Sequence, residues 1–355
     1  MSTSPQYFLG ANTPGGFYSL YDEMLPENTR RAVFILKGGP GCGKSTLMRA
    51  VERSVKEEHV RTEEILCSGD PDSLDAILLP DQGIAVVDGT SPHAMEAACP
   101  GAVDRYVNLG SCYDSRALYP IRDKIRSCKA DCTASYRHAY QCLAACAALD
   151  EEIHTLLFTP ELSDKMARRS RGILTRELPA RSGTGSITKR FLSTPSHKGL
   201  LTLTDTALSQ CGRIYELTDR FHTAHGLLEP LLAGAVKRGY DVVACPDPMH
   251  PERLAHLLIP EAGLAFLSVP AGSGKPYRRL HLDAMADREL LRRHRTRIRF
   301  TRRISASLME EALGAFREAK ANHDRLENLY HPYVDFDRAE GKTKAVIAEI
   351  LSLLA

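Results

Sequence analysis

The sequence predicts an α/β fold in which two tandem domains are each built on a parallel sheet and followed by helices. Three patterns carry this prediction. An apolar, β-branched run at 32–36 leads into a glycine-rich loop at 38–45 and then into helical periodicity. A second apolar run, at 83–87, ends in the carboxylate of Asp88. The pattern of the first half then returns about 180 residues later, which indicates an internal duplication.

The glycine-rich loop has the spacing G-x-x-x-x-G-K-[ST], the Walker A or P-loop motif. Its glycines allow positive φ angles, so that successive backbone N–H groups converge on an anion at the start of the helix. Lys44 would reach the β- and γ-phosphates of a nucleotide, and the Ser45 hydroxyl would bind Mg²⁺. A turn that bound nothing would not need these two residues. The residues expected to contact ATP are Gly38, Gly39, Pro40, Gly41, Cys42, Gly43, Lys44, Ser45 and Thr46.

The apolar strand that ends at Asp88 has the Walker B pattern. An aspartate at this place helps to hold Mg²⁺, so Asp88 is the expected partner of Ser45 at the metal. The next residues are Gly89-Thr90-Ser91-Pro92-His93, and no glutamate follows the aspartate. Thr90, His93 or an aspartate of a nearby loop would therefore have to position an attacking water.

An acidic loop, Ser68-Gly69-Asp70-Pro71-Asp72-Ser73-Leu74-Asp75, follows a short strand predicted at 63–67 and is expected to run into a short helix. Ligands of parallel sheets bind at the carboxyl ends of the strands, so Asp70 or Asp72 could act as a base toward a hydroxyl or water. The alternative is that these aspartates only cap the following helix. The sequence leaves both interpretations open.

Composition narrows the class of protein. The 355 residues are 43% hydrophobic and carry a net charge of only +2, as expected for globular domains without an overall affinity for polyanions. The polar start Met1-Ser2-Thr3-Ser4-Pro5 has no signal-peptide pattern, and no apolar run is long enough to span a membrane. Ten cysteines are scattered along the chain, so reduced thiols in a cytoplasmic protein are the expectation.

Helical periodicity is predicted at about 113–157 and 161–178, and again at about 286–330 and 337–354. Each pair is interpreted as a helical hairpin appended to its domain. Four cysteines share one face of the first long helix, but a ten-residue gap separates the second from the third, which is too long for a single zinc site. Core packing is therefore favoured for them. They are Cys128, Cys132, Cys142 and Cys146.

The segment 167–190 is rich in arginine and contains a Ser-Gly tract, so it is interpreted as a flexible basic linker. The expected domains are 1–166 and 191–355.

The second domain repeats the first without its binding residues. In place of the glycine-rich loop it reads Thr218-Asp219-Arg220-Phe221-His222-Thr223-Ala224-His225-Gly226, with His225 near the position of Lys44. Ser268 stands at the position of Asp88, so this domain is expected to be a degenerate partner. The later Ala271-Gly272-Ser273-Gly274-Lys275 is predicted to be a turn.

A dense group of arginines lies within the helix predicted at 286–330. They cover about 100° of one helical face, which we call the basic face, and could bind a protein partner, nucleic-acid phosphates or anionic lipids. The alternative is a solvated face that pairs with acidic residues of the first domain. The residues are Arg288, Arg292, Arg295, Arg299, Arg302 and Arg303.

With the Walker A motif, the Asp70–Asp75 loop, the run Asp88–His93 and the duplication, the chain resembles an uncharacterised bacterial family of tandem P-loop ATPase-like proteins. The resemblance covers nearly the full length and implies an α/β fold of two tandem P-loop NTPase-like parallel-sheet domains. It also implies ATP binding. In that family both halves can carry a phosphate loop, whereas this chain departs from the pattern at 218–226 and at Ser268.

The expected activity is Mg²⁺-dependent ATP binding and hydrolysis by the first domain, slow or stimulated by a partner, with Lys44 and Asp88 as the central residues. One alternative is a small-molecule or nucleotide kinase that uses Asp70 or Asp72 as the base. Another is a nucleotide-gated module that binds nucleic acid or membrane through the basic face, Arg288 to Arg303. The oligomeric state, the acceptor and the preference for ATP over GTP do not follow from the sequence.

Overall fold

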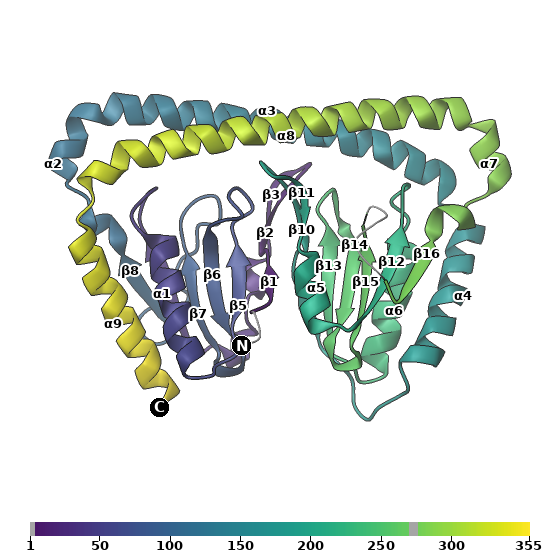
Figure 1. The fold of residues 1–355 in the computed structure, drawn as a ribbon, viewed down its shortest axis with the longest axis horizontal. Helices are drawn as coiled ribbons and strands as arrows, with labels where there is room; N and C mark the ends of the chain where they lie inside the picture. Colours follow the sequence, from purple (N-terminus) through teal and green to yellow (C-terminus); the bar gives the residue numbers. More distant parts are fainter. Residues whose placement is uncertain (1–3, 270–275) are drawn as a thin grey trace.

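The computed structural model describes residues 4–269 and 276–355. It has two six-stranded mixed sheets with helices, which agrees with the predicted α/β class and is compatible with two tandem domains. Figure 1 shows the two sheets side by side beneath a pair of long helices, α3 (Arg122–Leu157) and α8 (Arg295–Tyr330). The turn predicted at 271–275 lies outside the described residues.

The first sheet has the strand order β1-β5-β6-β7-β4-β8. Strand β6 is antiparallel to both of its neighbours, and the other adjacent pairs are parallel, so the sheet is mixed and not purely parallel as expected. The strands are Gln6–Tyr7 (β1), Ala32–Lys37 (β4), Glu63–Leu66 (β5), Leu74–Leu79 (β6), Ile84–Asp88 (β7) and Asp104–Asn108 (β8).

Strand β6 replaces the short helix predicted after the acidic loop. All six of its residues are buried, because neighbouring strands and helix α1 cover it on every side. A continuous apolar run of this length suits a central strand better than a helix with one exposed face. Asp70 and Asp72 therefore cap no helix, and the capping interpretation was wrong.

The second sheet repeats the first. Its order, β9-β13-β14-β15-β12-β16, has the same sequence of parallel and antiparallel pairs, with β14 antiparallel to both neighbours. Its strands are Ile187–Lys189 (β9), Arg213–Thr218 (β12), Val242–Asp247 (β13), His250–Ile259 (β14), Leu264–Ser268 (β15) and Arg278–His281 (β16). Each half also has a small hairpin, formed by Gly10–Thr13 (β2) with Gly16–Ser19 (β3) and by Ser193–Ser196 (β10) with Gly199–Thr202 (β11).

The remaining α-helices are Lys44–Glu57 (α1), Ser115–Leu118 (α2), Pro160–Glu177 (α4), Thr204–Gln210 (α5), His225–Lys237 (α6), Arg288–Arg293 (α7) and Phe336–Leu354 (α9). Short 3₁₀ helices lie at Tyr21–Glu23, Glu27–Thr29, Pro80–Gln82, Leu109–Cys112, Tyr119–Ile121, Pro260–Ala262, Leu282–Met285 and His331–Tyr333. No helix within the described ranges has the length and apolar character needed to cross a bilayer. Segment 167–190 begins inside α4 and ends just after β9.

The long helices are exchanged between the halves. Helices α3 and α8 pack along each other in antiparallel directions, so α3 starts over the first sheet and ends over the second, and α8 does the reverse (Figure 1). The helix that follows each one then packs on the opposite half: α4 on α6, and α9 on α1. The expected hairpins do not form, because each 36-residue helix carries the chain about 54 Å away from its own sheet.

The cysteines of α3 lie in this helix pair, as core packing predicted. The Cys128 thiol donates a hydrogen bond to the carbonyl of Asn322, and Cys146 contacts the Ser305 hydroxyl. Cys142 and Cys146 belong to a buried apolar cluster with residues of α8. Among the described residues, no group with metal-binding geometry contains a cysteine.

Candidate functional site

The glycine-rich loop, residues 38–45, joins β4 to α1 and is called the glycine loop below. Gly41 (φ 70°) and Gly43 (φ 90°) adopt left-handed backbone conformations that favour glycine. Gly43 directly precedes Lys44, the first residue of α1, so the loop brings its backbone N–H groups to the positive end of a helix dipole. A Cβ atom added at Gly43 would meet nothing within 4 Å. The loop is therefore open at the helix N-terminus.

Lys44 and Asp88 lie side by side. The Lys44 ammonium is 3.5 Å from Asp88 Oδ2, and it donates hydrogen bonds to the carbonyls of Gly38 (2.7 Å) and Gly39 (3.0 Å). Strands β4 and β7 are parallel neighbours, which brings the start of α1 close to the end of β7. Asp88 Oδ1 accepts hydrogen bonds from the Thr90 N–H and hydroxyl, so Thr90 orients this carboxylate.

Asp75, the last residue of the predicted acidic loop, and His93, one of the residues expected to position a water, extend this cluster. His93 Nε2 is 3.2 Å from Asp75 Oδ2, and the Tyr21 hydroxyl donates a hydrogen bond to the same oxygen. One ligand atom from each of Asp75, Asp88 and His93 lies within 4.8 Å of the others, and all three side chains are buried. Burial alone would lower the pKa of His93, but Asp75 and Asp88 outweigh it and raise that pKa.

Ser45 faces the same region. Its hydroxyl oxygen accepts a hydrogen bond from the backbone N–H of Leu74, the residue before Asp75. Asp70 and Asp72 lie elsewhere, in a group with His197 from the second half. Asp72 pairs with Lys198, which lowers the pKa of its carboxyl, and Asp70 is 3.6 Å from Lys320 of α8. These two aspartates therefore link the halves in this structure.

Helix α8 of the second half covers the outer side of the glycine loop. A Cβ atom built on Gly41 would come within 3.5–3.7 Å of Glu327. The hydrogen bond from His323 lowers the pKa of the Glu327 carboxyl. Burial opposes this shift, and the Gly41 backbone N–H adds to it. Contacts with Cys132 and Glu327 raise the pKa of His323 to about 9. A carboxylate thus already faces one amide of the loop.

Tyr113 supports the loop from the β8 side. Its hydroxyl donates a hydrogen bond to the Pro40 carbonyl (2.8 Å), and its ring packs on Tyr330 at the end of α8. A cavity of about 340 Å³ opens beside Tyr113, between segments 111–114 and 332–338. Residues of the glycine loop do not line it, so this cavity lies beside the segment that supports the loop and not at the loop itself.

The corresponding loop of the second half binds its own carboxylate. Residues 219–224 join β12 to α6, and His225 is the first residue of α6, as Lys44 is of α1. Asp219 accepts hydrogen bonds from the N–H groups of Thr223 (2.8 Å) and Ala224 (2.7 Å) and from the Thr223 hydroxyl (3.0 Å). Ser268 ends β15 as Asp88 ends β7. The amides at this helix start already have an anionic partner, so the loop lacks a free phosphate cradle.

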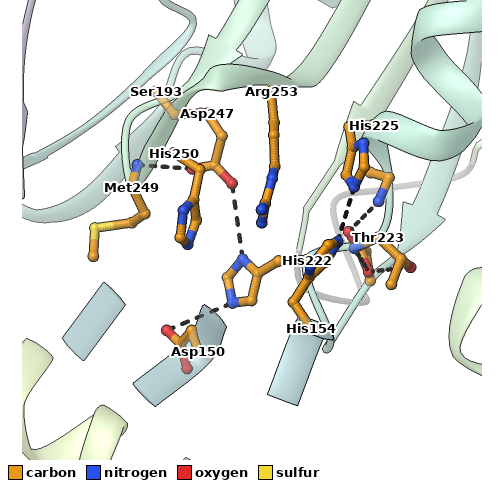
Figure 2. A network of polar contacts seen from close by, with 12 residues as sticks. Asp150, His154, Ser193, His222, Thr223, His225, Asp247, Met249, His250 and Arg253 are labelled. Carbon is orange, nitrogen blue, oxygen red and sulfur yellow. Dashed lines mark hydrogen bonds and ion pairs between the residues drawn. The ribbon is translucent and has the colours of Figure 1, made fainter. Parts of the chain in front are cut away.

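A polar network fills the space between this loop and α3 (Figure 2). The His222 ring lies between Asp150 of α3 (3.6 Å) and Asp247 of β13 (3.8 Å), as Figure 2 shows. His154 of α3 and His225 of α6 face each other with their Nε2 atoms 2.9 Å apart. Glu151 of α3 pairs with Arg253 of β14. Each long helix therefore contacts the loop of the half that it crosses.

The helix predicted at 286–330 is divided at His294 into α7 and α8, so the six arginines of the basic face do not lie on one helix: Arg288 and Arg292 belong to α7 and the other four to α8. All six are exposed, at the end of the molecule far from the glycine loop (Figure 1). Within residues 4–269 and 276–355, none of its six arginines forms an ion pair, so the predicted pairing with acidic residues is not found. The neighbouring Arg297 does pair, with Glu152 of α3. Arg303 lies over the exposed ring of Phe300. In the described parts of the chain, this group of arginines is therefore exposed without an acidic partner.

Sequence reasoning missed Glu327 and Tyr113, and within the acidic loop it singled out Asp70 and Asp72 instead of Asp75. Asp75 could have been found as the only charged residue in the apolar run 74–79. Glu327 could not be identified from the sequence, because nothing in the sequence indicates that α8 crosses to the first half.

Comparisons with protein-family models, with curated proteins and with solved structures each gave no match.

Proposed function

We propose that the first half binds Mg²⁺–ATP at the glycine loop and hydrolyses it slowly, or faster when a partner is bound. The observation that carries this proposal is the position of Lys44 between the glycine loop and Asp88. In the structure Lys44 bonds to two loop carbonyls, so its ammonium needs only a side-chain rotation to reach a phosphate held by the loop amides.

The residues present fit a nucleotide and its metal. The left-handed Gly41 and Gly43 shape a cradle that a side chain at Gly38 would disturb, since a Cβ there would lie 2.6 Å from the Cys42 sulfur. Ser45 and Asp88 would hold the Mg²⁺. When bound, this ion supplies positive charge that offsets the charge on the phosphates. The second half would then be a non-catalytic partner, because Asp219 occupies the equivalent amides.

The test compares the wild type with Lys44→Ala in two assays, release of phosphate from Mg²⁺–ATP and direct nucleotide binding. We expect the variant to lose phosphate release and most of its affinity. Arg53→Ala is the matched control, because Arg53 is an exposed cation on the same helix. If the wild type fails to bind Mg²⁺–nucleotide, the proposal is wrong.

The kinase alternative gives a different outcome in the same assays. A kinase would bind ATP without releasing free phosphate until an acceptor is added, and its base would be Asp70 or Asp72. Against this, both carboxylates already have a lysine partner in the structure, Asp70 with Lys320 and Asp72 with Lys198, and the Lys198 contact lowers the pKa of the Asp72 carboxyl. A screen of hydroxyl and nucleotide acceptors would follow such a result.

A nucleotide-gated polyanion-binding module is the other candidate, and the unpaired arginines of the basic face favour it. Its test is retention on single-stranded DNA and on anionic vesicles at rising salt. Retention should fall steeply with ionic strength and should be lost when Arg299, Arg302 and Arg303 are changed to glutamate. The same triple variant should keep the nucleotide affinity of the wild type, because the basic face is remote from the glycine loop (Figure 1).

A further inference from the structure

Asp75, Asp88 and His93 have the composition and placement of a metal-ligand set. Asp88 ends β7, and the antiparallel register of β6 with β7 pairs Ala76 with Val87, which puts Asp75 next to Asp88. His93 follows β7 in the chain and turns back onto Asp75. One donor atom from each residue lies within 4.8 Å of the other two. Two adjacent strands and one connecting segment thus converge on a single point.

The three side chains are almost removed from solvent, with exposed fractions of 7% for Asp75, 11% for Asp88 and 4% for His93. Burying two carboxylates together is costly unless positive charge lies between or beside them. In addition, His93 Nδ1 is buried and has no hydrogen-bond partner. The ring nitrogen beside the carboxylates is Nε2, 3.2 Å from Asp75 Oδ2, and its lone pair becomes available to an ion when the ring proton moves to the unpartnered Nδ1.

Lys44 is the cation that Asp88 has in the structure. If Lys44 turned to the phosphates of a bound nucleotide, its ammonium would move away from Asp88, and this carboxylate would lose a positive charge. A divalent ion between Asp75 and Asp88 would restore it.

The donor set decides the kind of ion. Mg²⁺ is bound almost entirely by oxygen atoms, whereas imidazole together with carboxylates suits divalent first-row transition metals. We propose that Asp75, Asp88 and His93 form a binding site for one such ion beside the glycine loop. The inference deepens the proposed function and rests on it in part, because Asp88 would serve both. The binding itself does not require a nucleotide.

Asp70, Asp72 and His197 provide a matched control. They form the other three-residue group with suitable spacing among the described parts of the chain, but Asp72 is exposed and each of the two aspartates has a lysine partner. Neither His197 nor the two aspartates is buried. A change at Asp72 should therefore leave the proposed ion in place.

The experiment is a titration of the full chain with Mn²⁺, without nucleotide, in which free Mn²⁺ is measured by electron paramagnetic resonance. The wild type should bind one Mn²⁺, and excess Mg²⁺ should displace it poorly. His93→Gln and Asp75→Asn should each weaken binding at least tenfold, with thermal melting as the check that they fold. Asp72→Asn should bind as the wild type does.

Equal Mn²⁺ affinity in folded His93→Gln and wild type would overturn the inference, as would loss of binding in Asp72→Asn. If one of the variants does not fold, the other decides. Lys44→Ala separates this inference from the proposed function, since it should lose nucleotide affinity and keep Mn²⁺. A wild type that binds Mn²⁺ but no nucleotide would refute the ATPase proposal and leave the metal site standing.

Discussion

Phe8 and Phe191 hydrogen-bond to each other through both of their backbone groups, with N–H to carbonyl distances of 2.9 Å in each direction. They hold equivalent places in the two halves, each just before its hairpin, and both side chains are fully buried. Such mutual contact between equivalent residues is the mark of a two-fold axis. The duplicated halves therefore pack as the subunits of a symmetric dimer do.

This central contact should matter for stability. Phe191→Ala should lower the free energy of unfolding by about 3–5 kcal/mol, because it removes a large buried ring between two halves that cannot collapse into the space. Urea denaturation measures the loss. Phe300→Ala is the control: its ring is 58% exposed, and the change should stay within about 0.5 kcal/mol. If Phe191→Ala and Phe300→Ala lowered the free energy of unfolding by similar amounts, the central contact would not have the stabilising role predicted for it.

Glu327 should restrain nucleotide binding, if the glycine loop binds ATP as proposed. Its carboxylate faces the Gly41 amide and would repel a phosphate chain. Glu327→Gln keeps the shape and removes the charge, so ATP affinity should rise roughly fivefold, or by about 1 kcal/mol. Calorimetric titration measures this, and Glu318→Gln, an exposed carboxyl on the same helix, should change nothing. A weaker affinity in Glu327→Gln would mean that the carboxylate helps binding.

His154 should make the protein sensitive to acid. Burial, followed by the positive charge of Arg253, lowers the pKa of His154 to about 4, whereas an unfolded histidine titrates near 6.5. The unfolded chain takes up this proton first, so stability should fall as the pH drops from about 6.5 to 4, by about 2–3 kcal/mol from this group. His154→Gln should flatten that part of the profile. His138→Gln, exposed on the same helix, should not.

His222 should make the protein less stable as the pH rises, whereas His154 makes it less stable as the pH falls. Burial opposes its charge, but Asp247 and Asp150 outweigh this effect and raise the pKa of His222 to about 9. Its stabilising contribution is therefore complete below about pH 6.5 and is lost as the pH rises through 9. His222→Gln should cost about 1–2 kcal/mol at pH 6, less than the pKa shift alone implies, because the ring is partly exposed. The two unfolding curves should converge near pH 10; a constant difference would show that the loss is one of packing.

Local patterns in the sequence predicted local geometry well. The apolar run before the glycine loop became β4, the helix begins at Lys44, and Asp88 ends its strand beside Lys44. Each of these follows from short-range rules, namely the burial of both faces of a strand and the conformational freedom of glycine. The repeat seen in the sequence is likewise matched by the repeated strand order.

Relations between distant segments were not predictable in the same way. The segment expected to be a helix after Asp70 is strand β6. Its pairing with β5 and β7 buries it, and this pairing cannot be recognised from the residues of the segment alone. Two consecutive helices with a short connection usually form an antiparallel hairpin, which is why hairpins were predicted here. Here α3 instead pairs with α8, which begins 138 residues after α3 ends, so the sequence did not indicate the contact of Glu327 with the glycine loop.

Because α4 packs on the second half and α9 on the first, the part of the chain up to α4 and the part from β9 onward each contribute a helix to the other. One covalent connection joins these two parts. A fragment ending after α4 would expose the surface of α4 that packs on α6, and its own α1 would lack α9. Neither fragment can complete a fold alone, yet each carries the piece that the other lacks. Two such fragments, produced separately and mixed, would have to assemble in order to fold, so the connection between α4 and β9 is a place where the chain could be cut without separating its parts.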